Sequence, residues 1–295
     1  MKFIFYGNYF YGLCAVALSI EAALQQRYPL NDPWYYLFVF LLTIFYYMYP
    51  YVRETTMTGR NPRSNWYTRY YSLMRANQLA IGLALAILGT AFLLKFGKHL
   101  ITMPVSHWLW ILVFPLAGLL YYGVNLLPRG FNLRNRGWLK PFVIGFTWAG
   151  LVNIYPVMYY DITHGLSFTP DLVSVFLFLK NFMFISVLCI MFDIKDYSTD
   201  YISSLRTFVV RLGLRKTIYS ILLPLSAIGL GTFVYYAVKN HFHPMKVILN
   251  VIPFLLLLAV AYSLLKRRTI LYYLVVVDGL MLIKAICGTL AMVYF

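Results

Sequence analysis

The sequence contains few acidic residues and few charged residues of any kind. Only 9 of its 295 residues are Asp or Glu, and charged residues make up 12% of the chain. Soluble globular domains carry about 25% charged residues, so this chain has too few of them to cover a water-exposed surface. Because 61% of the residues are apolar, and long apolar segments satisfy their backbone in lipid as helices, we expect an all-α polytopic membrane protein.

Cysteine is also scarce, and familiar soluble-enzyme motifs are missing. The three cysteines, Cys14, Cys189 and Cys287, lie inside apolar segments without C-x-x-C pairing, which excludes a secreted disulfide scaffold. The chain contains no G-x-x-x-x-G-K-[ST], G-x-S-x-G or H-E-x-x-H sequence. P-loop hydrolysis, serine esterase and zincin chemistry therefore have no support.

Long apolar segments divide the chain into nine predicted transmembrane spans in a single domain, residues 1–295. At about 20 residues per crossing, the predicted spans are 3–24, 34–52, 78–94, 107–127, 139–160, 171–192, 217–238, 246–265 and 269–294. Most Lys and Arg residues fall in alternate loops, which by the positive-inside rule predicts a cytoplasmic N-terminus and an external C-terminus. This rule accounts for the net charge of +16 without a nucleic-acid partner. We expect a multi-pass protein of a bacterial inner (plasma) membrane.

Three of the nine acidic residues lie close together after the sixth predicted span. If that span continues as a helix, spacings of three and seven residues place Asp193, Asp196 and Asp200 on one face. Three like charges at a helix C-terminus repel one another and meet the negative end of the helix dipole, so they favour a counter-cation. Mg²⁺ is a suitable ion, because it binds one or two carboxylates together with substrate phosphates. A solvated turn and an ion-transport pathway are the alternative interpretations.

The residues around this cluster resemble a motif of the UbiA superfamily of intramembrane prenyltransferases. That motif reads D-x-x-D-x-x-x-D, then a small residue, K/R-T and L-G; this chain has, at the same spacing, Asp193, Asp196, Asp200, Ser204, Arg206-Thr207 and Leu212-Gly213. A second, weaker similarity includes Tyr121-Tyr122, Pro128, Arg134, Trp138-Leu139-Lys140-Pro141 and Trp148. The resemblance extends to nine spans with a cytoplasmic N-terminus and implies a UbiA-like helical bundle.

The chain departs from the family at the first aspartate-rich motif. This motif, N-D-x-x-D-x-x-x-D, belongs at the end of the second span. The positions of its Asn and three Asp are filled by Met48, Tyr49, Val52 and Thr56. Glu54 is the one acid nearby, while Arg63 stands about where the family places a phosphate-facing arginine. A second metal ion therefore has no evident ligands in the sequence.

The resemblance implies a reaction in which a prenyl diphosphate loses diphosphate and the allylic cation alkylates a lipophilic acceptor, such as an aromatic or quinone precursor, within the lipid bilayer. Mg²⁺ held by Asp193, Asp196 and Asp200 would neutralise the leaving group. Arginine grips phosphate oxygens bidentately and could replace part of the missing metal. The candidates for diphosphate binding are Arg53, Arg63, Arg134, Lys140, Lys195 and Arg206.

Two other functions remain open from the sequence. One is a homologue that binds isoprenoid lipids without transferring them. The other is a cation-coupled transporter with Asp193, Lys180 and Asp278 as its relay. Lys180 and Asp278 lie inside predicted spans, where a charge must face protein or water, so we expect them to form an ion pair.

Overall fold

A computed structural model describes residues 1–53, 62–122, 137–202 and 204–295, and the regular secondary structure of these residues is helical throughout. In the first half of the chain the helices are α1 (Lys2–Tyr6), α2 (Tyr9–Gln25), α3 (Pro33–Arg53), α4 (Pro62–Arg69), α5 (Tyr71–Thr102) and α6 (Val105–Tyr122). The middle of the chain forms α7 (Lys140–Ala149), the π-helix η3 (Gly150–Ile154), α8 (Tyr155–His164), α9 (Leu172–Ile202) and α10 (Phe208–Leu212). The remaining helices are α11 (Leu214–Thr217), η4 (Ile218–Leu222), α12 (Leu223–Lys239), α13 (Pro244–Ser263), α14 (Ile270–Tyr272), η5 (Tyr273–Val277) and α15 (Gly279–Tyr294).

Helices occupy all nine predicted spans. Within the described ranges, seven helical segments are long and apolar enough to cross a membrane. Two shorter apolar helices, α2 and α6, occupy the first and fourth predicted spans. The fold class, a polytopic all-α bundle, is therefore confirmed.

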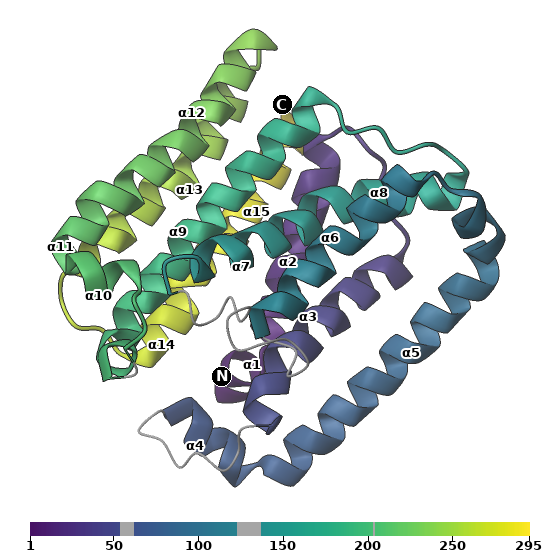
Figure 1. Cartoon of the computed structure of the whole chain (residues 1–295). Coiled ribbons are helices and arrows are strands. Elements are labelled where there is room, and N and C mark those ends of the chain that lie inside the picture. The colour runs from purple at the N-terminus through teal and green to yellow at the C-terminus, as the bar shows by residue number, and fades with distance from the viewer. Residues whose placement is uncertain (54–61, 123–136, 203) are drawn as a thin grey trace.

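Helices α2, α9 and α15 form the centre of the bundle (Figure 1). α9 packs against α7 and α12, while α15 packs against α2 and α13. α5 runs along one side, and only 6% of its most apolar stretch is buried in the protein. The exposed side chains of α5 include Leu79, Leu83, Ile87 and Leu94. Such a surface suits contact with lipid rather than water.

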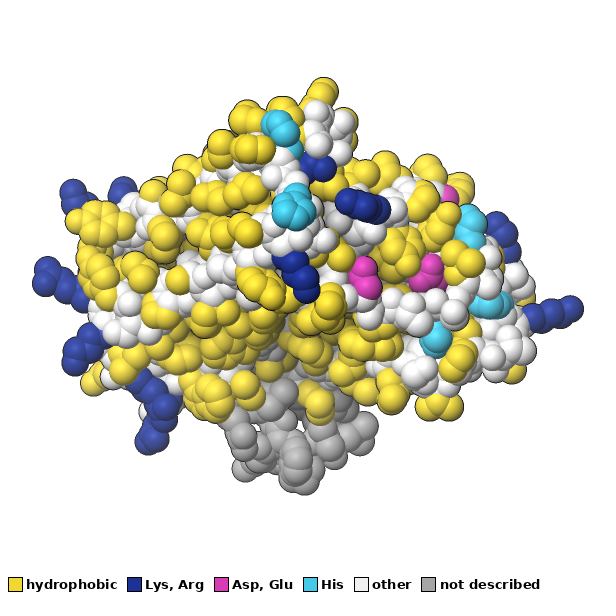
Figure 2. Space-filling model, turned by 90° about the horizontal axis from the view of Figure 1, so that it is seen from above, with side chains coloured by type: hydrophobic (Ala, Val, Ile, Leu, Met, Phe, Trp, Pro, Cys, Tyr) yellow, Lys and Arg dark blue, Asp and Glu magenta, His cyan; other side chains and the backbone are white. Residues whose placement is uncertain are grey.

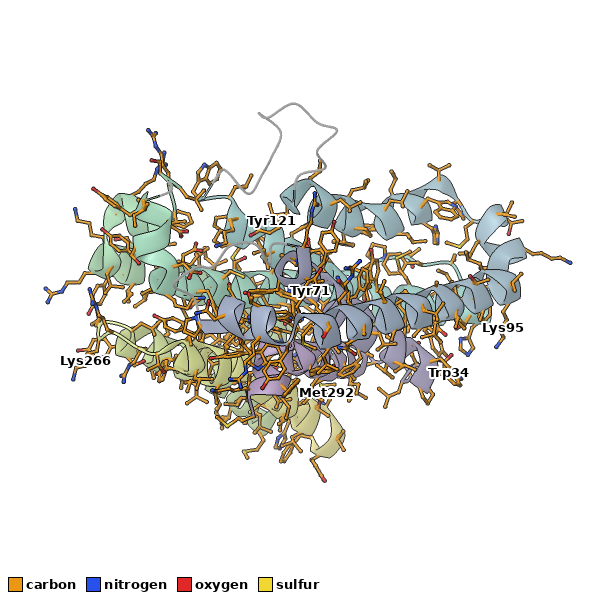
Figure 3. The ribbon with its side chains drawn as sticks, turned by 90° about the horizontal axis from the view of Figure 1, so that it is seen from below. Trp34, Tyr71, Lys95, Tyr121, Lys266 and Met292 are labelled. Carbon is orange, nitrogen blue, oxygen red and sulfur yellow. The ribbon has the colours of Figure 1, made fainter. Side chains whose placement is uncertain are left out.

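The charged and apolar surfaces are separated along the long axis of the bundle. Figure 2 shows apolar side chains covering most of one face, with Lys and Arg gathered mainly at one end. In Figure 3, Lys266 lies at one end while Trp34 and Lys95 lie at the other. The predicted topology likewise places Lys266 and Lys95 in loops on opposite sides of the membrane. The N- and C-termini also lie toward opposite ends (Figure 1).

Close helix crossings depend on glycines that leave room for a neighbour. A Cβ added at Gly145 in α7 would lie 3.0 Å from the Phe182 carbonyl oxygen of α9 and closer still to the Ser186 hydroxyl. A Cβ at Gly288 in α15 would lie 2.6 Å from Cδ of Glu21 in α2. The first crossing aligns α7 beside the middle of α9, and the acidic residues lie farther along this helix toward its C-terminus.

Candidate functional site

The acidic cluster lies on the last turns of α9. This helix has 31 residues, which corresponds to a length of about 46 Å, whereas the hydrocarbon core of a bilayer is about 30 Å thick. α9 is thus long enough to extend beyond the bilayer, and it carries Asp193, Asp196 and Asp200 near its C-terminus. The prediction that the helix continues through all three residues is confirmed, so their spacing places them on one face.

Asp193 is fully buried and forms an ion pair with the first residue of α7. The Lys140 ammonium donates to Asp193 Oδ1 at 2.8 Å, and 20% of the Lys140 side chain is exposed. Asp193 Oδ2 is also buried, and it has no hydrogen-bond partner among the described residues. A buried carboxylate oxygen without a partner is costly, so this atom suits a ligand that supplies positive charge.

The other two aspartates have different surroundings. Asp196 is partly exposed and lies 3.1 Å from the Lys195 ammonium. Asp200 is buried, and its desolvation raises the pKa of its carboxyl to about 6 although the positive charge of Lys140 acts in the opposite direction. Negative charges on Asp193 and Asp196 also raise this pKa, which indicates that the three acids lie within electrostatic range of one another.

The two segments that carry the family resemblance meet in space. A Cβ added at Gly137 would lie only 2.7 Å from the backbone carbon of Arg206 and the backbone nitrogen of Thr207. Thr207 caps the N-terminus of α10, because its side chain accepts a hydrogen bond from the Val210 amide. Gly213 ends this helix at φ +79°, a conformation that favours glycine. Gly137, shortly before Lys140, and Arg206-Thr207, shortly after Asp200, are therefore in direct contact.

The residues present can contribute to a Mg²⁺ site, although they do not enclose one. Within the described residues, no group of three or more His, Cys, Asp and Glu side chains is arranged to hold a metal ion. Mg²⁺ typically takes one or two carboxylates and completes its octahedral shell with water and substrate phosphates. The unpartnered Oδ2 of Asp193 fits the role of such a ligand. The three-aspartate metal site remains a prediction.

The predicted phosphate-binding cations have different environments. Lys140 and Lys195 contact the acidic cluster directly, through Asp193 and Asp196 respectively. Arg53 and Arg206 are exposed, and Arg134 lies outside the described residues. Arg53 Nη1 donates to the Tyr49 hydroxyl at 3.1 Å. The assignment of these residues to diphosphate binding remains a prediction.

Arg63 is buried, and part of its guanidinium serves internal packing. Its Nε and Nη2 donate to the Tyr6 carbonyl oxygen at 3.2 and 3.1 Å, and Nη2 also donates to the Asn8 side-chain oxygen. The guanidinium carbon lies 4.5 Å from the centroid of the Tyr51 ring. These contacts attach α4 to the start of the chain, a structural role that the sequence did not reveal.

The positions of the first aspartate-rich motif contribute to the hydrophobic core instead. Met48 is fully buried and Val52 is nearly so, and both pack in a cluster with Trp66 and Tyr67. Tyr49 is exposed. Glu54 and Thr56 lie outside the described residues. The two buried positions thus supply apolar packing where the family has metal ligands.

A further buried acid, Asp278, lies near the cluster. Tyr11 of α2 donates its hydroxyl hydrogen to Asp278 Oδ2 at 2.7 Å, and the Tyr11 ring stacks on Tyr47 with 4.6 Å between centroids. The charges of Asp278 and Asp193 both act on Cys189 of α9, so each acid lies within electrostatic range of this residue. Asp278 follows the π-helix η5, and π-bulges frequently accompany functional sites.

The predicted ion pair between Lys180 and Asp278 is wrong. Lys180 lies 3.7 Å from Glu21 Oε1, and Asp278 instead accepts the hydrogen bond from Tyr11. Spacing along the chain does not report which spans are neighbours in space, so the sequence paired the wrong charges. The signal for the correct partner was present, because Glu21 is an acidic residue inside the first predicted span.

The helices and the acidic cluster at the end of α9 define a polytopic all-helical membrane protein, and the expected fold is supported by a similar solved structure. A solved structure titled as work on the biosynthesis of digeranylgeranylglyceryl phosphate synthase in membranes is similar over 96% of this chain and 94% of its own, with a TM-score of 0.57 and 12% identity. A scan against protein families and a search of curated proteins each find no match.

Proposed function

We propose that this protein is an integral membrane prenyltransferase that transfers an isoprenoid chain from a prenyl diphosphate to a lipophilic acceptor with the help of Mg²⁺. The observation that carries the proposal is the fully buried Asp193 on α9, with one oxygen paired to Lys140 and the other without a partner among the described residues. The fold shared with a membrane prenyltransferase supports it.

Mg²⁺ would neutralise the diphosphate leaving group, with Asp193, Asp196 and Asp200 as its candidate protein ligands. Lys140 and Lys195 contribute positive charge beside these acids, where the developing negative charge of the departing diphosphate needs stabilisation. The allylic carbon–oxygen bond of the donor breaks and its electron pair leaves with the diphosphate. The remaining cation is stabilised by the π-faces of nearby aromatic rings.

Alkylation of the acceptor releases one proton, which must be taken up by a base. The Tyr11–Asp278 pair is our candidate for this base, because the buried Asp278 carboxylate, held by the Tyr11 hydroxyl, is a group that can accept a proton. The stacked Tyr11 and Tyr47 rings, with the Tyr47 hydroxyl accepting a hydrogen bond from Trp148 Nε1 at 2.7 Å, form an aromatic wall beside it.

Diphosphate release from a long-chain prenyl diphosphate tests the proposal. We expect release by the purified protein to require Mg²⁺, to stop with a chelator, and to fall at least 100-fold in Asp196→Asn. Because Asp196 is partly exposed, this variant should keep its fold. Asp171→Asn is the matched control at the opposite end of α9, where an amide can still cap the Ser174 backbone. Release that is unaffected by Asp196→Asn would refute the metal site.

A catalytically degenerate, isoprenoid-binding protein is the second candidate. It is favoured by one observation, the packing of Met48 and Val52 into the core at positions where the family's first motif carries an Asn and an Asp. This candidate predicts tight binding of a prenyl diphosphate with no turnover in any acceptor extract. A transporter has less support, since the Lys180–Asp278 contact assumed for its relay does not form.

A further inference from the structure

A patch of positive charge lies at one end of the helix pair α12–α13. Two short segments carry it, one before α12 and the other after α13. The six cations that form this basic patch are Arg211, Arg215, Lys216, Lys266, Arg267 and Arg268. All six side chains are exposed. Lys266 lies at the left end of the bundle in Figure 3, which is the end where Lys and Arg gather in Figure 2.

The two segments come together because α12 and α13 form an antiparallel hairpin. Only residues 240–243 connect the end of α12 to the start of α13, and the two helices contact one another. The π-helix η4, which joins α11 to α12, also contacts α13. The cations before α12 and those at 266–268, shortly after α13, therefore lie at the same end of the hairpin.

The positive charge of the basic patch is not balanced by the described residues. None of its six members forms an ion pair with an acidic side chain in the part of the chain that the structure describes. Arg268 donates to the Ser263 carbonyl oxygen at 3.2 Å and lies 4.8 Å from the centroid of the Tyr272 ring, and both contacts leave its charge in place. Asp196 and Arg268 both act on Tyr273, so one acid borders the patch. The large positive excess attracts anionic groups from the surroundings.

The side chains next to the basic patch place it at the depth of lipid headgroups. Tyr219 lies about one helical turn after the last cation before α12, and Tyr262 about one turn before the first cation after α13. These tyrosines are 55% and 63% exposed, and exposed Tyr is typical of the boundary between membrane and water. Farther along the two helices the exposed side chains include Leu223 and Leu255. Both helices thus pass from cations through tyrosine to leucine, as expected from headgroup layer to hydrocarbon.

Charge and depth together indicate the chemistry of the partner. Arginine binds phosphate oxygens bidentately, and lysine binds them as a point charge. Clusters of about four to eight Lys and Arg residues beside a membrane span attract anionic phospholipids. A phospholipid already lies in the plane of the membrane at this depth, so its phosphate reaches several exposed cations without leaving the bilayer.

We infer that the basic patch binds the headgroups of anionic phospholipids in preference to zwitterionic ones. The cations contact the phosphate and the added negative charge of the headgroup, while exposed apolar residues of α12 and α13 contact the acyl chains. This binding fixes the depth of the hairpin in the membrane. The inference does not depend on the proposed function, because the patch shares no residue with the acidic cluster or with the candidate diphosphate ligands.

Lipid retention by the purified full-length protein tests the inference. The protein is solubilised with equal amounts of phosphatidylglycerol and phosphatidylcholine that carry the same acyl chains, and the retained lipids are counted by native mass spectrometry. We expect phosphatidylglycerol to be retained with a preference of about fivefold or more. Combining Arg215→Gln, Lys216→Gln and Arg267→Gln should remove most of this preference. All three side chains are exposed, so the buried contacts of the fold stay intact.

A matched variant controls for the change in net charge. Lys95→Gln, Lys98→Gln and Lys239→Gln together remove the same number of exposed cations from the opposite end of the bundle, and this variant should keep the preference. The wild-type preference should also fall at high salt, because exposed charges are screened. Equal retention of the two lipids by the wild type, or equal losses in the two triple variants, would overturn the inference.

A direct measurement on the wild-type protein needs no variant. A photoreactive phosphatidylglycerol in nanodiscs should crosslink to peptides that contain residues 211–219 or 262–268. Glycerol phosphate, which offers a phosphate without acyl chains, should not displace the lipid at equal concentration. Crosslinks confined to other surfaces would contradict the inference, and displacement by glycerol phosphate would show a site for soluble anions instead.

Discussion

The ion pair between α7 and α9 should be the most sensitive electrostatic contact at the candidate site. Replacing Lys140 with Met removes the ammonium that lies 2.8 Å from Asp193 Oδ1. The carboxylate of Asp193 is 0% exposed, and its second oxygen already has no partner among the described residues. The variant therefore leaves a buried carboxylate with neither oxygen bonded to the protein.

The expected loss of stability follows from this burial. Removing one partner of a buried ion pair costs about 3–5 kcal/mol, because the other charge stays buried without compensation. Since 20% of the Lys140 side chain is exposed, water screens part of the interaction. We therefore expect Lys140→Met to lower the free energy of unfolding by about 2–3 kcal/mol.

A double-mutant cycle distinguishes the cost of leaving the Asp193 carboxylate unpaired from the cost of losing the packing of the Lys140 side chain. Lys140→Met combined with Asp193→Asn removes both charges, so it should be within about 1 kcal/mol of the wild type. The free energy of unfolding is measured for all four proteins in the same detergent by denaturant titration. A double variant as unstable as Lys140→Met alone would refute the reasoning, because the unpaired Asp193 carboxylate would then not be the cause of the lost stability.

Three further predictions concern the same region of the fold. Gly145→Ala should lower the free energy of unfolding by about 1–3 kcal/mol, because its Cβ meets the Ser186 hydroxyl and the Phe182 carbonyl; an unchanged unfolding temperature would contradict this close approach. The raised pKa of Asp200, about 6, means that the folded state disfavours the ionised carboxyl. Stability contributed by its protonation is therefore present below about pH 4 and lost as pH rises through about 6. Because solvent screens part of the effect, it amounts to about 1–2 kcal/mol, and in metal-free buffer Asp200→Asn should flatten this part of the stability–pH curve. Tyr11→Phe removes the hydrogen bond to Asp278 and should destabilise the protein by about 1–3 kcal/mol, whereas Tyr219→Phe, at an exposed position, should have no effect on the unfolding temperature.

Features that depend on local sequence could be predicted well. Each of the nine apolar segments is helical, because a segment of about 20 apolar residues in lipid satisfies its backbone as a helix. The spacing of Asp193, Asp196 and Asp200 placed them on one helix face for the same reason, since helical geometry is local. The motif similarity also located the two loops that meet at Gly137 and Arg206.

Contacts between spans could not be predicted in the same way. The sequence predicted an ion pair between Lys180 and Asp278. In the structure, Lys180 instead lies beside Glu21, a residue 159 positions away in the first span. Asp278 accepts a hydrogen bond from Tyr11. The position of Arg63 in the sequence predicted a phosphate ligand. In the structure, its Nε and Nη2 donate hydrogen bonds to the Tyr6 carbonyl oxygen and the Asn8 side chain. Hydropathy indicates that a segment can cross a membrane, but it does not encode which helices are neighbours.

The sequence by itself determined that this chain is a helical membrane protein, which segments form its long apolar helices, and which helix carries the acidic face. Its apolar content and the local geometry of a helix are sufficient for those conclusions. Only the tertiary structure decided which charges are compensated, leaving Asp193 with one oxygen available and Lys180 and Lys284 with a single carboxylate between them. The physical reason is that buried charges are matched across helix interfaces, and those interfaces depend on close steric fit at positions such as Gly145 and Gly288.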